Sequence, residues 1–135
     1  MSNTRPILLS LALFTTAVGH AQAIISPAER SCAEGAPGVH VSPLFSDSLA
    51  SSFLICIDEQ VPPHLHAHHT EHVMVVDGEG SMRLGDQVRS VKAGDVIIIP
   101  AGTVHAVKVI GSAPLRVVSV QSPRYDGSDR VLVSP

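Results

Sequence analysis

The pattern of apolar and polar positions changes at residue 51. From there on, short apolar segments rich in β-branched residues alternate with Gly, Pro and Asp turns, and no segment has a helical period. The expected strands are 51–57, 72–76, 81–84, 88–91, 96–99, 104–109, 115–120 and 131–133. Many short strands separated by turns are typical of sandwiches and barrels. The pattern therefore predicts an all-β domain over residues 51–135.

The preceding segment, residues 24–50, is dominated by Ser, Pro, Gly and Ala. Ser26 and Glu29 match a helix capping box with Pro27 in the first turn, and Gly35 could end such a helix. We therefore expect a short N-terminal helix followed by an irregular lead-in.

The first residues have the layout of a secretory signal peptide. Arg5 precedes an uncharged apolar stretch from Ile7 to Val18, and Ala21, Gln22 and Ala23 form a small-x-small cleavage site. The stretch is shorter than the roughly 20 residues that a membrane-spanning helix needs. The sequence predicts that residues 1–23 are a signal peptide cleaved after Ala23, which leaves a secreted or periplasmic protein without a membrane span.

Composition excludes one class of partner. The chain has nine Lys and Arg against twelve Asp and Glu, a formal net charge of −3, and 3% aromatic residues. It lacks both the basic footprint and the stacking side chains of a nucleic-acid-binding protein.

Two cysteines, Cys32 and Cys56, remain after the predicted cleavage. In an oxidising compartment they could form a disulfide that attaches the N-terminal segment to the barrel. The alternative is a pair of buried free thiols, since the sequence does not give the distance between the two Cα atoms. Both interpretations stay open at this stage.

Histidine is the unusual residue of this chain: of eight, five lie between His64 and His72. His64 and His66 are two residues apart, so on a strand they project from the same face. Glu71 opens the next strand, and His105 follows a Pro-x-Gly corner. An antiparallel pairing could bring Glu71 beside the two histidines.

These residues resemble the two motifs of the cupin family. The first motif, G-x5-H-x-H-x3,4-E-x6-G, is matched in order by His64, His66, Glu71 and Gly78. The second motif, G-x5-P-x-G-x2-H-x3-N, is matched at the family spacing by Gly94, Pro100, Gly102 and His105. Two positions depart from the pattern, because Asp58 stands at the first Gly and Val109 at the final Asn.

The resemblance implies a double-stranded β-helix, or jelly-roll, barrel with one metal inside. Carried over by position, the ligands are His64, His66, Glu71 and His105. Three imidazoles and a carboxylate suit a divalent transition metal such as Fe, Mn, Ni, Cu or Zn, and leave one or two coordination positions open. The aliphatic positions expected to line the barrel by strand parity are Val73, Val75, Val107 and Val109.

Three more histidines, His68, His69 and His72, lie outside the motif. They are candidates for positions beside the metal or at the barrel mouth, where an imidazole can exchange protons near neutral pH. The alternative is that they are solvated loop residues. His68 is the best candidate if the strand of His64 and His66 continues that far, whereas His72 should point out of the barrel.

Two functions agree with these residues. One is a metal-dependent enzyme of the dioxygenase, isomerase or lyase type, acting on a small polar organic molecule in the barrel. The other is a non-enzymatic protein that binds or stores metal or holds a small ligand. The fold does not distinguish between these two functions. Metal binding is the expectation that both share. Family resemblance also implies a homodimer, which an exposed N-terminal edge strand would favour.

Overall fold

The computed structural model describes residues 23–32 and 37–134 of the chain. Apart from Ala23, the predicted signal peptide lies outside the described residues. Within the described ranges, no helix is long and apolar enough to cross a membrane.

The described residues form ten strands and one short 3₁₀ turn, η1, at Pro27–Glu29. The strands are β1 (Val39–Ser46), β2 (Ser51–Ile57), β3 (Gln60–His66), β4 (Thr70–Asp77), β5 (Glu79–Leu84), β6 (Gln87–Lys92), β7 (Val96–Ile99), β8 (His105–Ile110), β9 (Leu115–Ser122) and β10 (Arg130–Leu132). The all-β prediction is confirmed, and the predicted strands 51–57 and 96–99 have the observed bounds.

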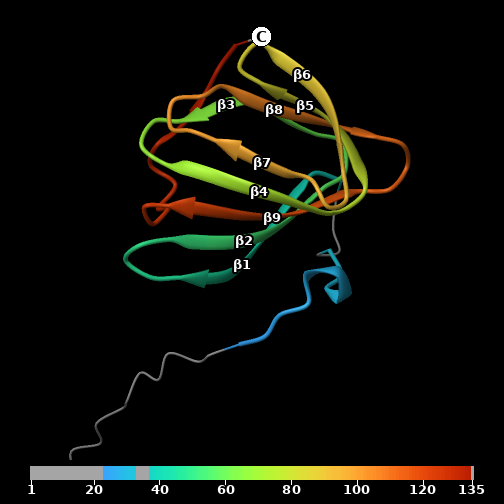
Figure 1. Ribbon diagram of the computed structural model, residues 1–135, viewed down its shortest axis with the longest axis horizontal. Helices are drawn as coiled ribbons and strands as arrows, with labels where there is room; N and C mark the ends of the chain where they lie inside the picture. Colours follow the sequence, from blue (N-terminus) through green and yellow to red (C-terminus); the bar gives the residue numbers. More distant parts are fainter. Residues whose placement is uncertain (1–22, 33–36, 135) are drawn as a thin grey trace, which may run out of the picture.

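Two antiparallel sheets of five strands face each other, as Figure 1 shows. The strand order is β1-β2-β9-β4-β7 in the first sheet and β10-β3-β8-β5-β6 in the second. Alternation along each strand sends every second side chain between the sheets, as in β9, where Leu115 and Val117 are buried. The core contains residues from both sheets, for example Val75, Ile99 and Met82. This is the predicted jelly-roll architecture.

Strand β1 corrects the prediction of an irregular lead-in. It pairs antiparallel with β2 and forms one edge of the first sheet, with an irregular register between Pro43 and Phe45. Asp47 shapes the connecting turn, because its Oδ1 accepts the backbone N–H groups of Leu49 and Ala50. Exposed and half-buried positions alternate along β1. Because the segment is rich in Pro and Ser, this alternation is not recognisable from the sequence alone, and the strand becomes regular by pairing with β2.

The N-terminal segment contains less helix than the capping pattern predicts. A single 3₁₀ turn ends at Glu29, and the Ser26 side chain makes no capping hydrogen bond. The segment is instead attached by a Cys32–Cys56 disulfide, with a Cα–Cα distance of 5.8 Å, to a buried position of β2. The structure thus settles the question that the sequence left open, in favour of the disulfide.

Candidate metal centre

Three of the histidines meet between the sheets. The potential ligand nitrogens of His64, His66 and His105 all lie within 4.8 Å of one another, and all three residues are buried. The rings of His64 and His105 are 4.1 Å apart, centroid to centroid. The three side chains therefore point at one region of the barrel.

Strand register brings these histidines together. His64 in β3 is the direct cross-strand partner of His105 in β8, and His66 follows two residues later on the same face of β3. The Pro-x-Gly corner before β8 is held against this strand, because the N–H of Gly102 donates to the carbonyl of His66 at 2.7 Å. Two motifs about forty residues apart thus become neighbours through one antiparallel pair.

Backbone carbonyls orient two of the rings. His64 Nδ1 lies 2.9 Å from the carbonyl oxygen of Pro62, and His105 Nδ1 lies 3.0 Å from that of Thr103. Each carbonyl can only accept, so each Nδ1 carries the proton and each Nε2 keeps its lone pair. The buried Nε2 of His105 has no hydrogen-bond partner among the described residues. A metal ion would satisfy it, so these donors fit a metal.

Glu71 approaches the histidines from the opposite sheet. Its Oε2 lies 3.3 Å from His105 Nε2 and 3.5 Å from His66 Nε2. Its Oε1 accepts hydrogen bonds from Ser119 Oγ and from Gln121 Nε2, at 2.5 and 3.3 Å. The carboxylate is thereby held with one oxygen toward the histidines. All four residues named by the sequence lie around the same point.

The electrostatics of the site favour a neutral His64 imidazole and an ionised Glu71 carboxylate. Burial and the neighbouring His105 lower the pKa of His64 from 6.5 to about 4. Burial alone would raise the pKa of Glu71, but the nearby His105 and His66 rings and the hydrogen bond from Ser119 outweigh it and hold that pKa well below its ordinary value. These are the protonation states that metal ligation requires.

The site opens into a cavity of about 510 Å³ between the sheets. Its walls are mostly aliphatic and include Val73, Val75 and Val107, as strand parity predicts. Val109, by contrast, packs beside the core without lining the cavity. The polar wall residues other than the four predicted ligands are Gln121, Tyr125 and Arg130. The volume suits one small organic molecule.

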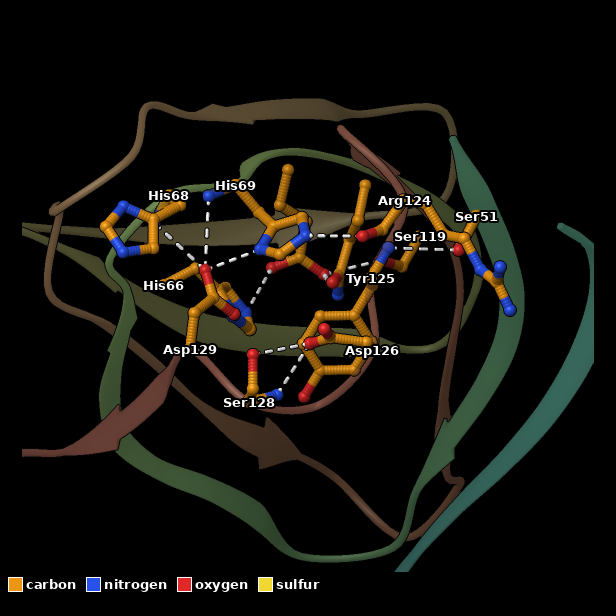
Figure 2. Close-up of polar contacts among 12 residues, drawn as sticks. Ser51, His66, His68, His69, Ser119, Arg124, Tyr125, Asp126, Ser128 and Asp129 are labelled. Atoms are coloured by element: carbon orange, nitrogen blue, oxygen red, sulfur yellow. Dashed lines mark hydrogen bonds and ion pairs between the residues drawn. The ribbon is translucent and has the colours of Figure 1, made fainter. Parts of the chain in front are cut away.

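The three extra histidines have different environments. Strand β3 ends at His66, so His68 lies in the following turn and is exposed, and His72 on β4 is also exposed. His69, 5% exposed, is the buried one. Its Nδ1 lies 2.5 Å from Asp129 Oδ2 and its Nε2 lies 2.9 Å from the Arg124 carbonyl (Figure 2). The strand-parity argument for His68 is therefore wrong, because the strand stops too early.

Burial alone would lower the pKa of His69, but the hydrogen bonds to the Arg124 carbonyl and to Asp129 outweigh it and raise that pKa. The carboxyl of Asp129 is buried too, which would raise its pKa. Hydrogen bonds from His69 and from the His68 N–H instead bring the pKa of Asp129 to about 2. His69 and Asp129 thus form a buried pair beside the histidine cluster.

Sequence reasoning missed several residues of the site. Ser119 and Gln121 are polar residues on the inward face of β9, so polar positions within an otherwise apolar alternation were the available signal. Asp129 lies in a turn, where an aspartate gives no such signal. The ring of Tyr125 lies 5.5 Å from that of His66, and Tyr125 lines the cavity.

Comparison with known sequences gives a family match and distant relatives. The family profile described as "Cupin domain" matches residues 53–121. An uncharacterised protein of Aquifex aeolicus is 35% identical over 83 residues, which are 62% of this chain and 68% of that protein. Mannose-1-phosphate guanylyltransferase RfbM of Salmonella typhimurium is 31% identical over 74 residues, which are 55% of this chain. The chain spans only 15% of that enzyme.

Solved structures share the architecture at lower identity. A conserved Klebsiella pneumoniae protein with a double-stranded β-helix domain superposes with a TM-score of 0.72 at 23% identity. The match covers 85% of this chain and 100% of that one. At this identity the likeness concerns the fold alone.

Proposed function

The chain belongs to the cupin family, and from that premise we propose that it binds one divalent transition metal through His64, His66, Glu71 and His105. The observation that supports this most is the convergence of three imidazoles and the Glu71 Oε2 at the wall of one cavity. Such a donor set suits Fe, Mn, Ni, Cu or Zn.

We propose further that the cavity binds a small polar organic molecule beside the metal. A bound metal would supply a Lewis acid with an open coordination position. The protein supplies aliphatic walls that exclude water and three polar groups that can orient a ligand, namely Gln121, Tyr125 and Arg130. Enzymatic turnover and simple ligand binding both agree with this arrangement.

The charge of Arg130 suggests an acidic group on that molecule. Arg130 is the cross-strand partner of His66 and lines the cavity. Among the described residues, no carboxylate lies within ion-pair distance of its guanidinium. Guanidinium groups pair well with carboxylates and phosphates. A small organic anion is therefore the ligand class we favour.

Storage of several metal ions has less support. Within the described part of the chain, the three clustered histidines form the single group that could hold an ion. Both ring nitrogens of His69 already have protein partners, and His68 and His72 are exposed. We therefore propose a stoichiometry of one metal per chain.

Export and self-association remain part of the proposal. The Cys32–Cys56 disulfide is typical of proteins in oxidising compartments, which supports secretion to the periplasm or outside the cell. Strand β1 forms a sheet edge with several exposed apolar side chains, including Val41 and Phe45, which supports a homodimer.

Metal analysis tests the core of the proposal. Wild-type protein reconstituted with Fe(II), Mn(II) or Zn(II) and freed of excess metal should retain one ion per chain. His105→Ala should lose it, whereas His72→Ala, which removes an exposed histidine, should retain it. Full retention by a His66→Ala/His105→Ala double variant contradicts the proposed ligands.

Ligand class is tested on the metal-loaded protein. Calorimetry with a panel of small carboxylic acids and their neutral amides should detect binding of acids only. Arg130→Gln should weaken that binding, while Arg124→Gln, at an exposed arginine of the same segment that does not line the cavity, should not. Equal binding of acids and amides contradicts an anionic ligand.

A further inference from the structure

One buried carboxylate outside the predicted ligands, that of Asp129, lies near the histidine cluster and contacts the turn between β3 and β4. Asp129 is 5% exposed and lies one residue before β10. Its Oδ2 accepts the backbone N–H groups of His68 and His69, at 2.9 and 3.2 Å, in addition to the His69 ring (Figure 2). The other carboxylate oxygen, Oδ1, points toward His66.

That second oxygen and the His66 ring form an incomplete pair. Asp129 Oδ1 and His66 Nδ1 lie 3.5 Å apart, and both atoms are buried. Neither has a hydrogen-bond partner within the described ranges, although buried polar atoms nearly always have one. A small shift of either group would complete a hydrogen bond between them.

His66 differs in this respect from the other two histidines. Pro62 and Thr103 supply backbone carbonyls to the Nδ1 atoms of His64 and His105. The atom that faces the Nδ1 of His66 is instead a carboxylate oxygen of Asp129. A histidine that ligates through Nε2 carries its proton on Nδ1, and an acceptor there fixes the ring and raises the basicity of Nε2.

We infer that Asp129 is a positioning residue. Its Oδ1 accepts a hydrogen bond from the Nδ1–H of His66 and thereby directs His66 Nε2 toward the proposed metal, which Glu71 also faces. The inference rests on the proposed function, because it concerns one of the proposed ligands. It assigns the role to a residue outside both sequence motifs.

Through His69, Asp129 also helps to hold in place the segment that contributes Tyr125 to the cavity wall. His69, from the turn between β3 and β4, contacts Asp129 with one ring nitrogen and the Arg124 carbonyl with the other. Between those two positions lies Tyr125, whose ring is 5.4 Å from that of His69 and which lines the cavity. One carboxylate therefore contributes both to the orientation of His66 and, through His69, to the position of the segment that contains Tyr125.

Substitution of Asp129 by its amide tests the inference. Asp129→Asn keeps the size of the side chain but weakens the acceptor opposite His66. Asp126→Asn makes the same change in the same loop, at an exposed aspartate that bonds Ser128 and not the histidines. Cobalt(II) titration, followed by its visible absorption spectrum, gives the dissociation constant. We expect Asp129→Asn to weaken cobalt binding by about 10- to 100-fold and to change the spectrum.

A second variant, His69→Gln, separates the orientation of His66 from the attachment of the segment that contains Tyr125. This variant removes the ring that clamps the segment but leaves Asp129 opposite His66. Its melting temperature without metal should fall at least as far as that of Asp129→Asn, while its cobalt affinity should fall much less. Equal losses of cobalt affinity in the two variants would show that Asp129 only holds the Tyr125 segment in place, and would overturn the inference.

A measurement on unchanged protein covers the case that Asp129→Asn does not fold. Long-range ¹H–¹⁵N NMR of the zinc-loaded wild type should place the His66 proton on Nδ1, in slow exchange with solvent. A proton on Nε2, or an Nδ1 proton in fast exchange with solvent, overturns the inference. Failure of the wild type to bind cobalt or zinc refutes the proposed function instead. Cobalt affinity of Asp129→Asn equal to that of Asp126→Asn refutes the positioning role alone.

Discussion

Ser119 donates a hydrogen bond from its Oγ to Oε1 of Glu71, and both side chains are buried between the sheets. Ser119 is the cross-strand partner of Val73, two residues from Glu71 on the neighbouring strand β4. The bond uses the carboxylate oxygen that faces away from the histidines. It therefore fixes the direction in which Glu71 presents its other oxygen.

Removal of that hydroxyl should weaken the proposed metal site. Ser119→Ala leaves Glu71 Oε1 with the longer Gln121 bond, so the carboxylate is held less firmly. We expect metal affinity to fall by about tenfold and the free energy of unfolding to fall by about 1–3 kcal/mol. Zinc competition and urea unfolding measure the two effects. Ser90→Ala, at an exposed serine of β6, should change neither, and an unchanged zinc affinity in Ser119→Ala contradicts the role of the bond.

Acid should destabilise the metal-free protein through His64. The folded protein holds the pKa of this residue at about 4, against 6.5 for an ordinary histidine. Between those values the unfolded chain binds a proton that the folded chain does not, so the free energy of unfolding falls as pH falls through this window. Below pH 4 this contribution no longer changes.

Urea unfolding of wild type and two variants, in the presence of a chelator at several pH values, measures how the free energy of unfolding depends on pH. His64→Asn cannot take up the proton and should lose less stability than wild type between pH 6.5 and 4. His72→Asn, at an exposed site, should follow wild type. Parallel curves for wild type and His64→Asn speak against the depressed pKa.

Two glycines of the motifs should differ in their tolerance of alanine. Gly78 and Gly94 both have positive φ, at 83° and 94°, so either substitution strains the backbone by about 1–2 kcal/mol. A Cβ at Gly78 would lie 2.5 Å from the Pro114 carbonyl oxygen, whereas one at Gly94 would meet nothing within 4 Å. Gly78→Ala should therefore lower the free energy of unfolding more than Gly94→Ala, and equal losses in denaturant unfolding would exclude the close approach as the cause.

Reduction of the disulfide should destabilise the protein by about 2–4 kcal/mol, because Cys32–Cys56 closes a loop between residues 24 positions apart. Urea unfolding with and without reductant measures this loss. A Cys32→Ser/Cys56→Ser variant should match the reduced protein and respond no further to reductant. If reductant leaves the stability of wild type unchanged, the bridge does not constrain the unfolded chain.

The sequence by itself determined the fold class and the group of proposed ligands. Strands such as β2 and β7 were predictable because apolar β-branched runs end at turn residues, which is local information. His64, His66, Glu71 and His105 were identifiable because their spacing matches two family motifs. Strand β1 was missed, because a Ser- and Pro-rich stretch becomes regular only by pairing with β2.

The tertiary structure decided which other polar groups support those ligands. Ser119, Asp129 and His69 come from three different parts of the chain, and their roles depend on distances that neither local pattern nor composition contains. His68, His69 and His72 lie close together in the sequence and outside both motifs. Of the three, His69 is the buried one, because β3 ends at His66 and the following turn brings His69 against Asp129. Strand periodicity determines which face a side chain takes, but pairing between distant strands and turns determines its partner.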